Sequence, residues 1–180
     1  ALDDAVRAHL QANGIATRPY DSFYEYVKTI SANETVLLDK GVVNYRIINS
    51  IPKEVRLVDE TDPADLMKAI KNPVQLENTR NAHIKDAVAM CKFMYWLKTN
   101  IGKIPMTEIS VSDHLAELRA EQEGFLDLSF DTICGYADHG AIVHYAATPE
   151  TDRPLEAKGL LLVDSGGHYL EGTTDITRTF

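Results

Sequence analysis

Residues 160–180 read LLLVDSGGHYLEGTTDITRTF, and this stretch carries the clearest structural signal in the chain. The apolar run at 160–163 is typical of a buried strand, so Asp164 arrives at the edge of a core. A second carboxylate, Asp175, follows eleven positions later, across a segment with hairpin character. Two carboxylates that adjacent strands bring to one place suit a divalent metal ion or an acid–base pair.

The register of this hairpin decides how close the two carboxylates lie. A two-residue loop at Tyr169-Leu170 predicts that Asp164 lies directly opposite Asp175, whereas Gly172 favours a slightly later loop or a bulge. Because opposed like charges are destabilising, the pair requires a counterion, either Arg178 or a divalent cation. In the alternative interpretation, Asp164 caps a turn and Asp175 lies on a solvated strand edge.

His144 is the third candidate site residue. It lies in the sequence GAIVHY at 140–145, which has the pattern of a strand. A lone histidine in a strand is more often a hydrogen-bonded structural residue than a catalytic one. A catalytic role therefore requires that this segment lie beside the two aspartates.

Hydrophobic periodicity divides the chain near residue 70. Residues 1–70 alternate between helical patterns and short strands at 35–38 and 55–58, which predicts an α/β unit. Residues 71–180 begin with helical patterns at 75–100 and 107–123. Four strand-like segments then follow, at 130–133, 140–145, 159–164 and 174–180. Helices followed by strands predict an α+β fold, with the helices on one face of an antiparallel sheet.

The longest helical pattern also predicts which side chains are buried. One apolar stripe runs through Ile84, Val88 and Cys91, and its neighbour runs through Ala87, Met90, Met94 and Leu97. We therefore expect one wide apolar face to pack on the sheet and Cys91 to be a buried thiol. Phe93 and Trp96 are interpreted as packing residues rather than as a binding site.

Composition excludes several classes of function. The net charge is -9, from 18 basic and 27 acidic residues, which argues against a nucleic-acid surface. No apolar run reaches the roughly 18 residues that a membrane-spanning helix needs. The two cysteines form no Cys-x-x-Cys pair, so we expect neither a thiolate metal site nor an exported, disulfide-linked fold. A cytoplasmic protein without nucleic-acid or membrane partners is the expectation.

Several motifs resemble one family, the proline-specific pita-bread metallopeptidases, and most closely the three-domain, cytosolic-type Xaa-Pro aminopeptidases (aminopeptidases P). The resemblance covers nearly the whole chain and is most specific in the motifs at 140–145 (GAIVHY), 162–167 (LVDSGG) and 172–179 (GTTDITRT). It extends upstream through 81–96 and 121–125.

The resemblance implies a chemistry for the three candidate residues. Asp164 and Asp175 correspond to two metal ligands, and His144 to a residue that contacts the substrate near the scissile bond. Two divalent ions, often manganese in this family, activate water to attack the carbonyl group before proline. The implied partners are peptides with an N-terminal Xaa-Pro sequence, and the implied parent protein can be a homodimer.

The chain departs from the family in one large respect. The family's remaining ligands, one His and two Glu, would follow Phe180. We therefore interpret the chain as a fragment: residues 1–70 as the end of an α/β, creatinase-N-like middle domain, and residues 71–180 as the first half of the catalytic domain. The 180 residues alone are predicted to be inactive. The alternatives for the parent are an Xaa-Pro dipeptidase (prolidase) and a non-catalytic pita-bread binding module.

Overall fold

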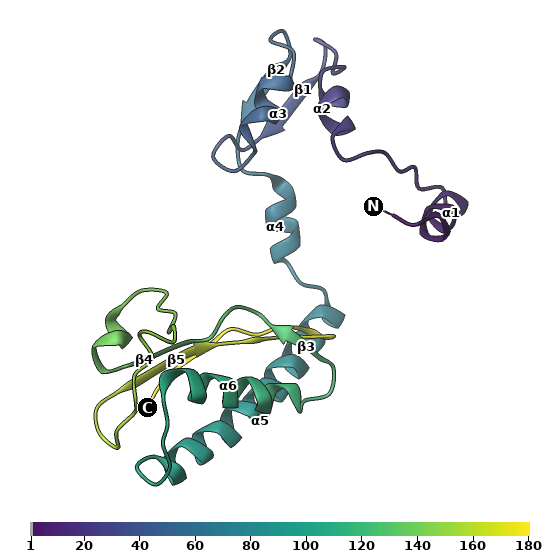
Figure 1. The fold of residues 1–180 in the computed structure, drawn as a ribbon. Helices are drawn as coiled ribbons and strands as arrows, with labels where there is room; N and C mark the ends of the chain where they lie inside the picture. Colours follow the sequence, from purple (N-terminus) through teal and green to yellow (C-terminus); the bar gives the residue numbers. More distant parts are fainter. Residues whose placement is uncertain (1) are drawn as a thin grey trace. The chain divides into compact units, whose positions relative to one another are not determined.

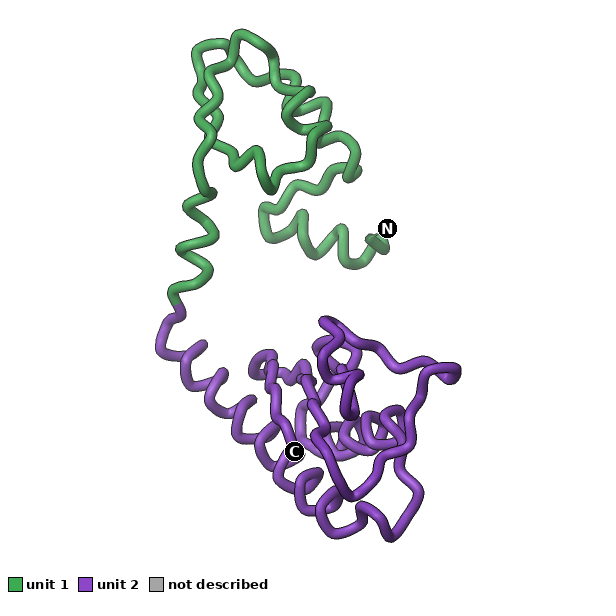
Figure 2. The backbone as a smooth tube through the Cα atoms, turned by 90° about the vertical axis from the view of Figure 1, so that its left-hand side faces the viewer, with its two compact units in different colours: residues 1–70 green, residues 71–180 purple. Residues whose placement is uncertain are grey.

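The computed structural model describes residues 2–180. The chain forms two compact units, residues 1–70 and residues 71–180, which Figure 2 distinguishes by colour. Each unit has its own cluster of buried apolar side chains, the smaller in the first unit and the larger in the second. The candidate site residues all belong to the second unit.

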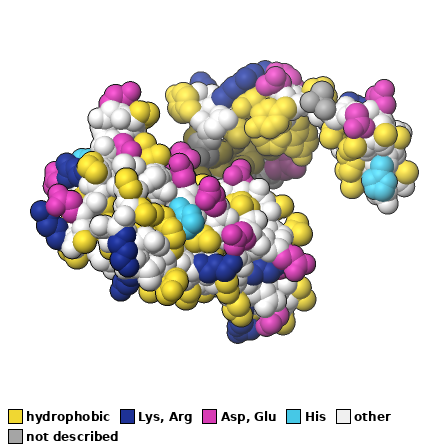
Figure 3. Space-filling model, turned by 60° about the horizontal axis from the view of Figure 1, so that its bottom comes forward, with side chains coloured by type: hydrophobic (Ala, Val, Ile, Leu, Met, Phe, Trp, Pro, Cys, Tyr) yellow, Lys and Arg dark blue, Asp and Glu magenta, His cyan; other side chains and the backbone are white. Residues whose placement is uncertain are grey.

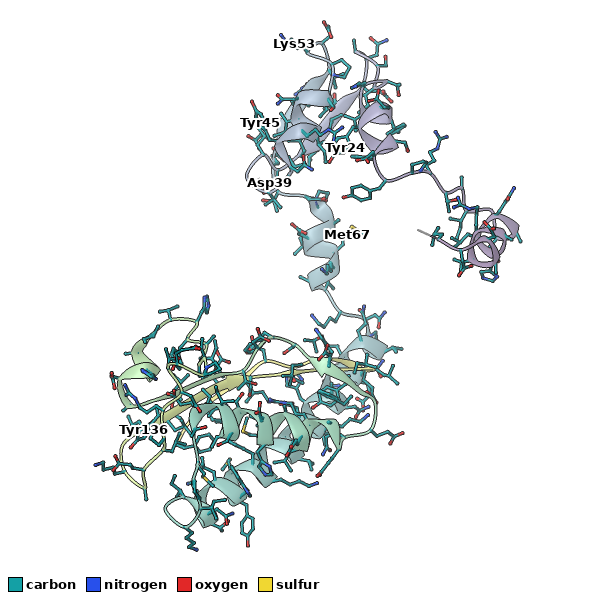
Figure 4. The ribbon with its side chains drawn as sticks, in the orientation of Figure 1. Tyr24, Asp39, Tyr45, Lys53, Met67 and Tyr136 are labelled. Atoms are coloured by element: carbon teal, nitrogen blue, oxygen red, sulfur yellow. The ribbon has the colours of Figure 1, made fainter. Side chains whose placement is uncertain are left out.

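The first unit is built around two parallel strands. Strands β1 (Thr35–Leu38) and β2 (Arg56–Asp59) pair directly, within one residue of the predicted ranges. The other elements are the helices α1 (Asp4–Ala12), α2 (Ser22–Val27), α3 (Tyr45–Ser50) and α4 (Pro63–Ala69). Helices α2 and α3 are joined through Tyr24, whose ring stacks under Arg46 and whose hydroxyl accepts a hydrogen bond from Asn44 (Figure 4).

Two capped helices open the second unit. Helix α5 (Pro73–Asn100) begins with a capping box formed by Asn72 and Gln75, and α6 (Glu108–Ala120) begins with one formed by Thr107 and Ser110. Both helices pack on the strands that follow them (Figure 1). The predicted helical ranges are confirmed, apart from a few residues at their ends.

Of the two apolar stripes predicted for α5, one is buried and the other is not. The helix buries Met90 and Leu97 of the second stripe together with Ala89 and Phe93, while Val88 and Cys91 of the first stripe are exposed. Apolar residues occupy much of the circumference of α5, so periodicity alone did not select a face. Asp86, a buried carboxylate, also lies on the packed side, which the apolar pattern does not reveal.

Six antiparallel strands complete the second unit. They form two sheets of three strands each, ordered β3-β6-β7 and β4-β5-β8. Their bounds are β3 (Phe125–Leu128), β4 (Ile133–Tyr136), β5 (Leu161–Ser165), β6 (Gly167–Tyr169), β7 (Gly172–Thr173) and β8 (Ile176–Thr179). With two helices packed on antiparallel strands, the predicted α+β class is confirmed.

The strand predicted at 140–145 does not form. Residues Ala137–Ala141 make a 3₁₀ helix, η1, and the chain then turns through His144, which has a φ of 53°. Within residues 2–180, no neighbouring strand pairs with this segment. Its β-branched residues Ile142 and Val143 therefore lie exposed in a turn rather than in a sheet.

Candidate functional site

Strand β5 carries Asp164, and Asp175 lies just before β8, in a register two residues away from the predicted one. Asp164 pairs with Thr177, and Asp175 immediately precedes β8. The hairpin loop lies at 170–171, one position later than Tyr169-Leu170, as Gly172 indicated. Because strand side chains alternate with a period of two, this shift leaves both carboxylates on one face, as diagonal rather than direct neighbours.

The three predicted residues come together at one cavity. Asp164, Asp175 and His144 all line a cavity of about 460 Å³, together with Phe130, Asp131, Ile133, Tyr145 and Ala146. The turn at His144 thus lies beside the two aspartates, which is the condition that a role for this histidine required. A cavity of this size is in the range of small-molecule and peptide sites.

Asp131 is a third carboxylate at this cavity, and the sequence analysis missed it. It is exposed and lies two residues before Ile133, which pairs with Asp164 in the β4–β5 ladder. The apolar pattern placed Asp131 inside a strand predicted at 130–133. In the structure, β4 begins only at Ile133, so Asp131 lies in the loop before it. Only the pairing of β4 with β5 brings it to the cavity.

One oxygen of the Asp164 side chain is available to a cation at this site. Its Oδ1 atom is buried and has no hydrogen-bond partner. An unpaired buried carboxylate oxygen is costly, and a divalent cation would satisfy it. Arg178, the other counterion considered, donates instead to the backbone carbonyl of Thr177. Asp164 and Asp175, at the same cavity, are therefore the candidate ligand pair for a metal ion.

The described residues supply only part of such a ligand set. Across residues 2–180, no group of three or more His, Cys, Asp or Glu side chains is placed to hold a metal ion. Two carboxylates leave most of the coordination positions of a divalent ion open.

Asp175 is presented by a tightly packed crossing of the chain. The hydroxyl group of Ser129 donates to the carbonyl oxygen of Thr174 (2.9 Å), and the amide of Gly167 donates to the Thr174 hydroxyl (2.9 Å). Thr174 is almost completely buried. These bonds fix the backbone on the N-terminal side of Asp175, and no pattern in the sequence indicated them.

The remaining histidines lie outside this cavity. His168 contacts the Thr173 hydroxyl across the β6–β7 pair, and His139 contacts the carboxylate of Glu108. Figure 3 shows acidic and basic side chains interspersed on the viewed face, without a continuous patch of Lys and Arg. No helix within residues 2–180 is long and apolar enough to cross a membrane.

Two family descriptions match the chain end to end. Residues 77–180 match the metallopeptidase family M24, and residues 1–75 match the creatinase/prolidase N-terminal domain. The first match covers more than half of the chain and contains all three candidate site residues.

Curated relatives are similar over nearly the whole chain. The chain is 35% identical to aminopeptidase P2 of Arabidopsis thaliana over 97% of its length, and 37% identical to Xaa-Pro aminopeptidase 1 of Dictyostelium discoideum over 99%. It spans only 29% and 28% of those proteins.

Solved structures share the fold. An X-prolyl aminopeptidase from Caenorhabditis elegans, described as a cytosolic enzyme with a di-nuclear active site, superposes with a TM-score of 0.86 at 32% identity. That match covers 99% of this chain and 30% of the other. A prolidase from Pyrococcus furiosus superposes with a TM-score of 0.65 at 22% identity, covering 91% of this chain and 45% of the other. The expected pita-bread fold of the second unit is confirmed by these neighbours.

Proposed function

The chain belongs to metallopeptidase family M24, and from that membership we propose that the whole protein is a metal-dependent Xaa-Pro aminopeptidase. It would release the N-terminal residue from peptides with proline in second position. The observation that carries this proposal is the unpaired buried oxygen of Asp164, at a cavity shared with Asp175 and His144. The names of the relatives support the choice of substrate class.

Each of the three residues has a proposed task. Asp164 and Asp175 hold divalent metal ions, for which we propose manganese. Metal ions bound there would supply Lewis acidity and lower the pKa of water. His144 lies at the same cavity and contacts the substrate beside the scissile bond, where an imidazole N–H can stabilise charge that develops on the carbonyl oxygen.

We assign the two units to parts of a longer architecture. Residues 1–70 are the end of an α/β middle domain, and residues 71–180 are the first half of the catalytic domain. The chain spans less than a third of its curated relatives, so we propose the activity for the whole protein and expect none from the 180 residues alone. A cytosolic location follows the description of the C. elegans relative.

The test is a substrate comparison with the full-length protein. We expect cleavage of the first residue from a longer Xaa-Pro peptide, loss of activity with a chelator and recovery with Mn²⁺. Asp175→Asn should lower kcat/KM by at least about a hundredfold, because a carboxylate ligand is lost. The matched control, Asp113→Asn on the exposed face of α6, should leave kcat/KM unchanged.

Two other outcomes would contradict the proposal. Activity restricted to Xaa-Pro dipeptides would identify a dipeptidase. Tight peptide binding without hydrolysis, in the presence of any divalent metal, would identify a binding module.

A further inference from the structure

Glu108 is a completely buried carboxylate that binds four groups of the second unit. It is the first residue of α6, and its side chain is 0% exposed. It accepts hydrogen bonds from the backbone amides of Tyr136 (2.8 Å) and Arg153 (3.2 Å) and from the hydroxyl of Tyr145 (3.0 Å). His139 also contacts both of its oxygens, at 2.9 and 3.0 Å.

These contacts do not serve the start of the helix. The N-terminus of α6 is already capped by Thr107 and Ser110, which exchange hydrogen bonds in a complete capping box. A buried carboxylate is costly unless its lone pairs are satisfied, and here groups far away in sequence satisfy them. The hydrogen bonds of Glu108 therefore stabilise the positions of those groups.

Three of the four groups flank the turn that carries His144. Tyr136 ends β4, at the entrance to η1 (Figure 4), and Tyr145 directly follows His144. His139 lies between them and packs its ring against Tyr145, with 4.6 Å between the ring centroids. One carboxylate thus holds both ends and the middle of segment 136–145.

The backbone of this segment is strained at both ends. Ala137 (φ 54°) and His144 (φ 53°) are the only non-glycine residues with positive φ within the part of the chain that the structure describes. Such conformations cost about 1–2 kcal/mol each and persist only where the surroundings over-determine them. Both lie within one residue of a group bonded to Glu108.

We propose that Glu108 is a positioning residue that holds the strained turn of segment 136–145 and thereby fixes His144 at the cavity. The inference rests on the proposed function for the role of His144, but the hold of Glu108 on the turn stands on the contacts alone. Glu108 acts through Tyr136, His139 and Tyr145, and it does not itself line the cavity.

Hydrogen exchange in the 180-residue chain tests the hold on the turn. Glu108→Gln keeps the shape of the side chain but replaces one carboxylate oxygen with an NH₂ group. That group cannot accept the hydrogen bonds that the backbone amides and the Tyr145 hydroxyl now donate. We expect exchange at the amides of Tyr136, Ile142 and Arg153 to rise at least tenfold, with less than a twofold change at Val163 in β5. Glu117→Gln, an exposed site on the same helix, is the matched control and should change none of these amides.

Kinetics of the full-length protein test the role of His144. Glu108→Gln should lower kcat at least tenfold with its metal content unchanged, because both proposed metal ligands lie on other segments. Unchanged exchange at the three amides, or an equal rise throughout the second unit, would overturn the proposal. A Glu108→Gln variant in which exchange rises at the three amides while kcat stays at the wild-type value would also overturn the proposal.

A second variant tests the proposal if the Glu108→Gln protein does not fold. Tyr145→Phe removes one donor and leaves Glu108 with three, so a smaller rise in exchange is expected at the same amides. No rise there would also overturn the proposal. If the wild-type protein lacks peptidase activity, the proposed function fails, whereas the exchange result still decides whether Glu108 holds the turn.

Discussion

Gly166 shows how closely the chain approaches itself beside the two aspartates. It joins β5 to β6. Its carbonyl oxygen accepts a hydrogen bond from the amide of Ser129 (3.1 Å), and the next amide, that of Gly167, donates to the Thr174 hydroxyl (2.9 Å). A Cβ atom at this position would lie 2.0 Å from the carbonyl oxygen of Thr174 and 2.4 Å from the hydroxyl oxygen of Ser129. Glycine is therefore required by space, not by a left-handed backbone.

At this residue we predict that Gly166→Ala destabilises the chain by at least about 2 kcal/mol, because a backbone carbonyl must move. The free energy of unfolding, from urea titration, measures the effect. Gly172→Ala in the same hairpin is the control. Its Cβ would meet only ordinary contacts, at 3.7 Å or more, so that change should be near neutral. Equal effects at the two glycines would contradict the packing argument.

Among the larger elements, α5 is joined to α6 and β6 by a buried polar triad. Arg119 binds both oxygens of Asp86 (2.6 and 3.2 Å), and the Tyr169 hydroxyl donates to Asp86 at 2.9 Å. Asp86 and Arg119 are completely buried. Burial and the neighbouring Asp86 carboxylate together raise the pKa of Tyr169, so its hydroxyl stays a donor.

The triad predicts a graded loss of stability. Asp86→Ala should cost about 3–5 kcal/mol, because it leaves Arg119 as an unpaired buried charge. Tyr169→Phe should cost about 1 kcal/mol, since Asp86 keeps its bonds to Arg119. Chemical denaturation measures both losses of unfolding free energy. The control is Lys92→Ala, which breaks the exposed ion pair with Glu121 and should cost less than about 1 kcal/mol. A Tyr169→Phe effect as large as that of Asp86→Ala would contradict this ranking.

The difference in solvent exposure between the two cysteines predicts how each reacts. Cys91 is exposed on this helix, whereas Cys134 is buried in β4. Burial raises the pKa of the Cys134 thiol from 9.0 to about 12, with a further contribution from the Glu108 carboxylate. The thiolate is the nucleophile, so at pH 8 we expect iodoacetamide to alkylate Cys91 and to spare Cys134 until the protein unfolds.

Mass spectrometry of the alkylated peptides measures the two alkylation rates, and equal rates in the folded chain would contradict this prediction.

The raised pKa of Cys134 also makes the stability of the fold depend on pH. The unfolded thiol ionises above pH 9 and the folded thiol only near pH 12, so this contribution to stability is lost as pH rises through that window.

At the scale of the whole molecule, the described residues carry two proposed metal ligands and no larger cluster within residues 2–180. We therefore predict that the 180-residue chain binds Mn²⁺ with a Kd weaker than about 1 µM, whereas the full-length protein binds two ions more tightly. Titration calorimetry with Mn²⁺ measures both. Two ions bound to the 180-residue chain with micromolar or better affinity would contradict the prediction.

The elements near the candidate site could be predicted to different extents. Strands β5 and β8 were predictable because a short apolar run and turn residues are local signals. The turn at His144 was not, because its β-branched residues favour a strand, whereas the flanking Tyr145 bonds to the distant Glu108. The burial of Asp86 on α5 was not predictable for a similar reason, since its carboxylate is buried in the company of Arg119 and Tyr169.

The sequence by itself determined the α+β class, the helices and strands with strong local periodicity, the family, and the three candidate residues Asp164, Asp175 and His144. These depend on short-range patterns or on motifs, which can be recognised from the order of residues alone. Only the tertiary structure decided the strand register, the strained turn, and the buried partners Glu108 and Thr174. Each of these depends on contacts between residues distant in sequence, whose free energies override local preference.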